Sequence, residues 1–274
     1  MLIDAHSHLD RYDLVGERAL ASALAEITRH RIFTISNSMD LSSYRRNLEI
    51  GGMCNWVLPT FGVHPWNAPV YADTLESLNE AIEQSPMLGE VGLDFYFVED
   101  VSAYPDQRRV FEFFLGAARE QGKIINLHTK GAEKETLQLL ERYDISRAIV
   151  HWYSGPLDTF REMVARGMYF TVGIEVLYSK HIRAIAQEIP SRRLLTETDN
   201  PGGPKGLIDK PGTPVLVKNV AQGLAEARKT SVEAIVQTVQ ANLLELIRND
   251  PWLTERWRRV LEEQHKCCPK LVQA

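Results

Sequence analysis

The sequence contains eight short apolar runs separated by segments with a helical period, and this alternation limits the folds that the chain can adopt. Each run is continuous and bounded by polar residues, glycine or proline, which is typical of a buried strand in a parallel sheet. The runs span residues 2–5, 33–36, 57–63, 87–93, 123–127, 148–150, 168–172 and 194–196. Between them, apolar residues recur at helical spacing, as at Val110, Phe113 and Phe114 and again at Val232, Ile235 and Val236.

Strands that alternate with helices indicate a parallel α/β fold. A doubly wound open sheet also alternates, but the first run is not followed by the GxGxxG turn of a dinucleotide site. We therefore predict a single (β/α)8 TIM barrel over residues 1–249 and a C-terminal helical tail over 250–274. In the tail, Trp252 and Trp257 are expected to serve packing.

Composition excludes several classes of protein. The 274 residues carry 31 Lys plus Arg against 36 Asp plus Glu, a net charge of −5, so no broad basic surface for nucleic acid exists. No apolar stretch is long enough for a membrane helix, and the N-terminus lacks a signal-peptide pattern. The cysteines, Cys54, Cys267 and Cys268, form no disulfide framework. We expect a cytoplasmic protein with no membrane contact and no evident obligate protein partner.

Histidines gather at the carboxyl ends of the predicted strands. Five of the eight histidines follow such a strand closely: His6, His8, His64, His128 and His151. In a barrel these strand ends meet on one rim, where active sites are built. The rim is therefore the expected site of the chemistry.

The first strand and two later ones supply groups that bind metal. His6 and His8 alternate along a strand and can face the same side, although two surface histidines would give the same pattern. Glu90 lies inside an apolar run, where a carboxylate is costly unless it is paired or bound to metal. Asp199 ends the last run, a position also common for a helix cap. Together these residues predict a metal centre.

Local sequence around these positions resembles the TatD family of metal-dependent hydrolases, within the amidohydrolase superfamily. The similarity extends from residue 2 to about residue 247. The matching segments are residues 4–10 (DAHSHLD), 62–65 (GVHP), 89–94 (GEVGLD), 127–128 (LH), His151 with 154–155 (SG), and 197–201 (ETDNP).

This resemblance implies a site with two divalent metal ions, such as Zn, Mg or Mn. It assigns His6, His8 and Asp199 to one ion, His128 and His151 to the other, and Glu90 to both. Two ions about 3.5–4 Å apart can activate a water and clamp a reacting phosphate. Asp199 would take the proton of that water, so Asp199 and Glu90 are the expected catalytic carboxylates. His64 would contact a phosphate or the leaving group, the alternative being packing against Trp66.

The resemblance also implies the reaction, hydrolysis of phosphodiester bonds in DNA by an exonuclease acting on single strands or ends. The expected substrate contacts are His64, Lys130, Tyr96 and Trp152. The chain has Thr129-Lys130 and Phe97 where many family members have Ser-Arg and Arg. Two alternatives stay open: a binuclear hydrolase of a small phosphoester, lactone or amide, and a binding module without catalysis.

Overall fold

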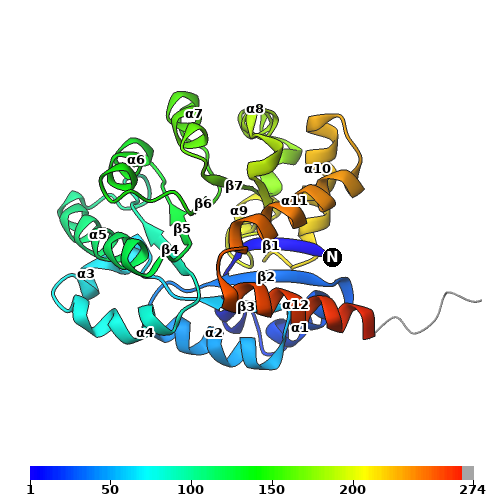
Figure 1. Ribbon diagram of the computed structural model, residues 1–274, viewed down its shortest axis with the longest axis horizontal. Coiled ribbons are helices and arrows are strands. Elements are labelled where there is room, and N and C mark those ends of the chain that lie inside the picture. The colour runs from blue at the N-terminus through cyan, green and yellow to red at the C-terminus, as the bar shows by residue number, and fades with distance from the viewer. Residues whose placement is uncertain (267–274) are drawn as a thin grey trace, which may run out of the picture.

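Every predicted strand segment contains a strand in the computed structural model, which describes residues 1–266 (Figure 1). The strands are β1 Leu2–Ser7, β2 Ile32–Asn37, β3 Val57–Thr60, β4 Leu88–Gly92, β5 Ile125–His128, β6 Ala148–Val150, β7 Tyr169–Val172 and β8 Leu194–Thr196. Neighbouring strands pair in parallel and in chain order, β1 to β3 and β4 to β8. The third strand is shorter than predicted because beyond Thr60 only Phe61 pairs, with Leu88 of β4.

The two runs of strands join to form the predicted (β/α)8 barrel. On one side, the Gly89 amide donates to the Phe61 carbonyl at 2.7 Å. On the other, the Asp199 amide donates to the His6 carbonyl at 2.9 Å, and the Thr196 hydroxyl donates to the Ile3 carbonyl at 2.6 Å. The second junction brings the first and last strand ends together, although they are almost two hundred residues apart in the chain.

Helices surround the strands (Figure 1). They are α1 Ala19–His30, α2 Leu41–Met53, α3 Ala68–Tyr71, α4 Asn79–Gln84, α5 Tyr104–Gln121, α6 Glu133–Arg142, α7 Leu157–Ala165, α8 Lys180–Glu188, α9 Lys205–Ile208, α10 Leu216–Arg228, α11 Val232–Ile247 and α12 Pro251–Lys266. The apolar face predicted around Val110 and Phe114 is buried in α5. Of the helices within residues 1–266, none is long and apolar enough to cross a membrane.

The last helix, α12, packs against the barrel. Its residues Leu253, Trp257 and Val260 are buried, and the Trp257 ring meets Phe33 of β2 edge to face at 5.3 Å. The packing role is confirmed for Trp257 but is wrong for Trp252, whose side chain is 55% exposed. The predicted domain limits, 1–249 and 250–274, stay predictions. Residues 267–274 of the predicted tail, with Cys267 and Cys268, lie outside the described residues.

Candidate metal centre

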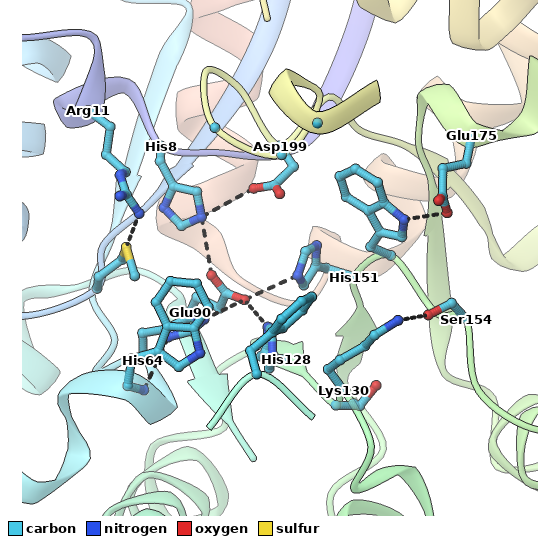
Figure 2. Close-up of a pocket in the computed structure, with 18 of the residues that line it drawn as sticks. His8, Arg11, His64, Glu90, His128, Lys130, His151, Ser154, Glu175 and Asp199 are labelled. Atoms are coloured by element: carbon cyan, nitrogen blue, oxygen red, sulfur yellow. Dashed lines mark hydrogen bonds and ion pairs between the residues drawn. The ribbon is translucent and has the colours of Figure 1, made fainter. Parts of the chain in front are cut away.

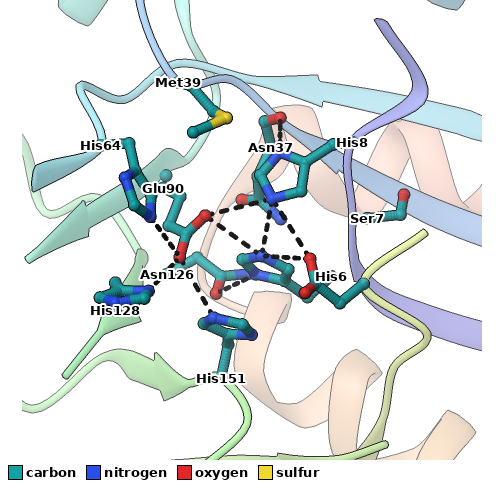
Figure 3. A network of polar contacts seen from close by, with 12 residues as sticks. His6, Ser7, His8, Asn37, Met39, His64, Glu90, Asn126, His128 and His151 are labelled. Carbon is teal, nitrogen blue, oxygen red and sulfur yellow. Dashed lines mark hydrogen bonds and ion pairs between the residues drawn. The ribbon is translucent and has the colours of Figure 1, made fainter. Parts of the chain in front are cut away.

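Of the six residues predicted to bind metal, five lie around the side chain of the sixth, Glu90 (Figures 2 and 3). All six come from the carboxyl ends of five strands of the barrel. His6 is in β1 and His8 follows it, Glu90 is in β4, His128 ends β5, His151 follows β6, and Asp199 follows β8. The fold therefore brings together residues that the chain spreads over almost two hundred positions.

The two carboxylate oxygens of Glu90 face different histidines. Oε2 lies 3.4 Å from Nε2 of His6 and 3.2 Å from Nε2 of His8. Oε1 lies 2.8 Å from Nδ1 of His128 and 3.1 Å from Nε2 of His151. Only 2% of the Glu90 side chain is exposed. One buried carboxylate thus stands between two pairs of imidazole nitrogens and can serve a cation on each side.

Asp199 completes the side that faces β1. Its Oδ1 lies 3.4 Å from Nε2 of His8 and 3.8 Å from Nε2 of His6. The side chain is 18% exposed, more than any other carboxylate of the cluster, and borders the cavity above it. Its backbone has a φ of 52°, a left-handed conformation that aspartate and asparagine adopt more readily than most residues. Asp199 is therefore both close to the cluster and accessible to a molecule in the cavity.

The second ring nitrogen of each candidate histidine ligand makes a polar contact with a residue outside the candidate ligand set. The contacts are His6 Nδ1 to Asn126 Oδ1 at 3.0 Å, His8 Nδ1 to the Asn37 carbonyl at 3.0 Å, His128 Nε2 to Asp94 Oδ2 at 3.0 Å, and His151 Nδ1 to Glu197 Oε2 at 3.2 Å. Such contacts fix the ring and its tautomer, so the other nitrogen points to the centre. Sequence reasoning assigned no role to Asp94, Asn126 or Glu197. Asp94 and Glu197 lie in segments that match the family, 89–94 and 197–201, and this was the only feature of the sequence that could have indicated them.

Charges within the cluster favour a cation. Burial raises the pKa of Glu90, but its interactions with the surrounding histidines, including a hydrogen bond with His128, outweigh burial and hold the pKa well below its ordinary value. Burial lowers the pKa of His8, yet hydrogen bonds to Asp199 and Glu90 outweigh burial and raise it to about 10. The carboxylates therefore stay ionised and attract positive charge, which metal ions can supply in place of protons.

The residues present fit divalent metal ions. Within the described part of the chain, three sets of side chains have donor atoms within 4.8 Å of one another: His6, His8 and Glu90; His64, Glu90 and His128; and His6, His151 and Glu197. Imidazole combined with carboxylate suits Zn, Mn, Fe or Ni better than Mg. Two of the three sets include Glu90, in agreement with a carboxylate shared between two ions.

His64 lies against the cluster. Its Nε2 is 3.6 Å from Oε1 of Glu90, and its Nδ1 accepts a hydrogen bond from the Trp66 amide at 3.3 Å. Its ring also packs edge to face with Trp66 at 4.7 Å. Burial lowers the pKa of His64 to about 3, so it stays neutral. His64 thus lines the cavity and also packs against Trp66, as its alternative role required, while its contact with substrate stays a prediction.

A cavity of about 530 Å³ lies over the cluster and is lined by Lys130 and Trp152 (Figure 2). Lys130 Nζ donates to Ser154 Oγ at 2.7 Å, and Trp152 Nε1 donates to Glu175 Oε2 at 2.7 Å. Tyr96 is not among the described residues that line the cavity. It lies behind Lys130, whose Nζ is 5.1 Å from the Tyr96 ring centre.

Asp94 connects the cluster to an aromatic wall of the cavity. Its Oδ2 contacts His128 and accepts a hydrogen bond from Trp66 Nε1 at 2.7 Å. Its Oδ1 accepts from the amides of Tyr96 at 3.0 Å and Phe97 at 2.8 Å. This carboxylate therefore orients a candidate ligand and the turn that presents Phe97 to the cavity.

Gly92 allows β4 and β5 to approach beside the cluster, and Gly92→Ala should destabilise the protein by more than about 3 kcal/mol. Its φ is +146°, and an added Cβ would lie 1.9 Å from the His128 carbonyl oxygen. The clash would push His128 away from Glu90. Thermal unfolding measures the loss. Gly116→Ala in α5 is the control, because its Cβ meets nothing within 4 Å and alanine favours a helix. Equal melting temperatures for the two variants would contradict the expected clash.

Comparison with known proteins agrees with this geometry. The sequence model of the family described as TatD related DNase matches residues 3–248. The chain belongs to the TatD family. It is 26% identical over 260 residues to the uncharacterized metal-dependent hydrolase YcfH of Escherichia coli K12, covering 91% of this chain and 96% of that protein. It is 24% identical over 261 residues to the human deoxyribonuclease TATDN3, and this match covers 89% of this chain and 94% of that protein.

Solved structures of TatD proteins share the fold. The crystal structure of YJJV, a TatD homologue from Escherichia coli K12, superimposes with a TM-score of 0.80 at 24% identity, covering 89% of this chain and 97% of that one. The family match and the fold together identify the protein as a metal-dependent hydrolase of the TatD family.

Proposed function

We propose that the protein hydrolyses phosphodiester bonds of DNA from a strand end, with two divalent ions bound around Glu90. The observation that carries the proposal is the position of Glu90, whose two oxygens face two separate pairs of histidine nitrogens. In this proposal His6, His8 and Asp199 hold one ion, His128 and His151 hold the other, and Glu90 serves both. When bound, such a pair of ions acidifies water and neutralises charge on a phosphoryl group.

In the proposed mechanism, Asp199 moves the proton. Burial raises the pKa of Asp199, but the hydrogen bond from His8 and the nearby histidine charges lower it below its ordinary value. The carboxylate is therefore ionised at neutral pH and can accept a proton from the attacking water. Its exposed side borders the cavity, where that water and the substrate would lie. Glu90 faces inward and keeps the histidines around it in place.

Four residues are proposed to contact the substrate. His64 and Lys130 border the cavity and would contact phosphate oxygens, with Lys130 supplying a positive charge. Trp152 also borders the cavity and offers an indole on which a base can stack. Tyr96 is 64% exposed behind Lys130, so it would contact only a part of the substrate outside the cavity.

The proposal of DNA as the substrate is supported by the names of the matching family and of the human relative. Single strands or strand ends suit a cavity of about 530 Å³, which has room for one or two nucleotides. A cytoplasmic location and the lack of an obligate protein partner stay predictions.

The test is cleavage of end-labelled single-stranded DNA by the purified protein with Mg²⁺ or Mn²⁺. We expect stepwise shortening that weakens steeply with added salt, while hydrolysis of bis(p-nitrophenyl) phosphate changes little. Glu90→Ala, prepared in the same way, controls for contaminating nucleases. If the metal-loaded protein hydrolyses the small diester but leaves DNA intact, the proposal fails and a small phosphoester becomes the better candidate.

A further inference from the structure

A second cation borders the cavity beside His8, and the mechanism above does not use it. Arg11 lies in the short helical turn Leu9–Leu14 that follows β1, and its side chain lines the cavity (Figure 2). The Arg11 amide donates to the His8 carbonyl at 3.1 Å, which ties the turn to the candidate ligand. The guanidinium is therefore held on the same wall as one half of the metal centre.

The Arg11 guanidinium has N–H donors that are available for a ligand. Its Nη1 donates to Sδ of Met39 at 3.1 Å, and a thioether is only a weak acceptor. Among residues 1–266 it forms no ion pair with a carboxylate. Arg46, on the outside of the same region, instead pairs with both Asp13 and Glu49. Arg11 is thus a half-buried cation that can still accept an anionic partner.

The charges around the cavity favour an anion on the Arg11 side. On the opposite wall, Lys130 is accompanied by two cavity-lining carboxylates, Glu133 and Glu175. Beside Arg11, the neighbouring carboxylate of Asp10 does not line the cavity, and its Oδ1 accepts a hydrogen bond from Asn47 at 3.2 Å. A negatively charged group that extends from the centre therefore meets less repulsion toward Arg11.

We propose that Arg11 binds a second phosphate of the substrate, next to the one that is hydrolysed, because its guanidinium lines the cavity beside His8 and forms no ion pair with a carboxylate of residues 1–266. The proposal rests on the proposed function and narrows it to substrates with two neighbouring phosphates. A guanidinium is suited to this role because it donates two parallel hydrogen bonds to phosphate oxygens. A diester with a single anionic group would gain nothing from it.

The test measures binding of two nucleotides to the metal-loaded protein by calorimetry. Thymidine 3′,5′-bisphosphate carries two phosphates on one sugar, and thymidine 5′-monophosphate carries one. The wild type should bind the bisphosphate about tenfold more tightly than the monophosphate, which is the gain expected from one additional charge-assisted hydrogen-bonded contact. Arg11→Gln should abolish this preference and Arg11→Lys should retain part of it. Arg29→Gln removes the same charge from the exposed face of α1, away from the cavity, and should preserve the preference.

Several outcomes overturn the proposal. The proposal is wrong if the wild type shows no preference for the bisphosphate. It is also wrong if Arg11→Gln keeps that preference, or if Arg11→Gln loses affinity for both nucleotides equally. Failure of the proposed function is a separate result. If DNA is not cleaved but Arg11 still determines the preference for two phosphates, the site acts on a small substrate with two phosphates.

Discussion

Glu90→Ala should leave the purified protein with almost no bound metal, a fall from about two ions per chain to well below one. The reason is that one carboxylate faces both groups of ligands. Oε2 lies near His6 and His8, and Oε1 lies near His128 and His151. Removing it takes an anionic donor from both ions and leaves imidazoles that repel one another when protonated. Elemental analysis of the purified variant measures the metal content.

A matched control separates this effect from a general loss of negative charge. Glu175→Gln removes a carboxylate from the same cavity but leaves an oxygen that can accept the hydrogen bond from Trp152. We expect this variant to keep its metal. Glu90→Gln adds a second comparison, because it preserves the volume of the buried side chain and removes only the charge. Full metal occupancy in Glu90→Ala would show that the two ions do not share this residue.

Loss of metal in Glu90→Ala should also abolish cleavage of both DNA and the small diester. The two losses belong together because the same residues would position water and phosphate. A variant that lost DNA cleavage alone would instead indicate damage to the substrate contacts.

The fold was predictable because the local residue pattern of each strand indicates that strand without knowledge of the rest of the chain. Short apolar runs between helical segments indicate buried parallel strands, and the structure confirms all eight. The convergence of His6, Glu90 and Asp199 was predictable for a related reason, since the carboxyl ends of barrel strands meet on one rim. Neither inference required knowledge of how individual side chains pack.

The supporting residues could not be found in the same way. Asn126 holds His6 across a separation of 120 residues, and nothing in its own neighbourhood distinguishes it from a polar residue in a strand. Glu197 precedes Asp199 by two positions, but only the packed barrel shows that it contacts His151 instead of facing the cavity. Contacts of this kind depend on the closure of the barrel, and a local pattern cannot encode them.

The sequence also could not show which of two neighbouring aromatic residues, Tyr96 or Phe97, lines the cavity. Tyr96 was one of the expected substrate contacts, yet Phe97 lines the cavity and Tyr96 does not. Asp94 accepts hydrogen bonds from both amides and so determines how the turn is oriented. A sequence shows that aromatic side chains are present, but the turn decides which one faces the substrate.

Asp199→Asn should retain much of the metal and lose turnover by roughly a hundred- to ten-thousand-fold, the usual contribution of a general base. Asparagine keeps the size of the side chain and tolerates the left-handed backbone at this position, where φ is 52°. His6, His8 and Glu90 would still offer three donor atoms to an ion on that side. The amide cannot accept the proton of the attacking water, so the chemical step should slow while binding persists. Turnover under saturating substrate and metal content per chain are the two measurements.

The control for Asp199→Asn is Asp209→Asn, which makes the same chemical change at another left-handed position in the loop after β8. Asp209 has a φ of 54° and is exposed, and it does not line the cavity. Its variant should match the wild type in both measurements. If Asp199→Asn keeps its metal and turns over within a few-fold of the wild type, another group takes the proton. If turnover falls only in proportion to lost metal, Asp199 acts as a ligand and not as the base.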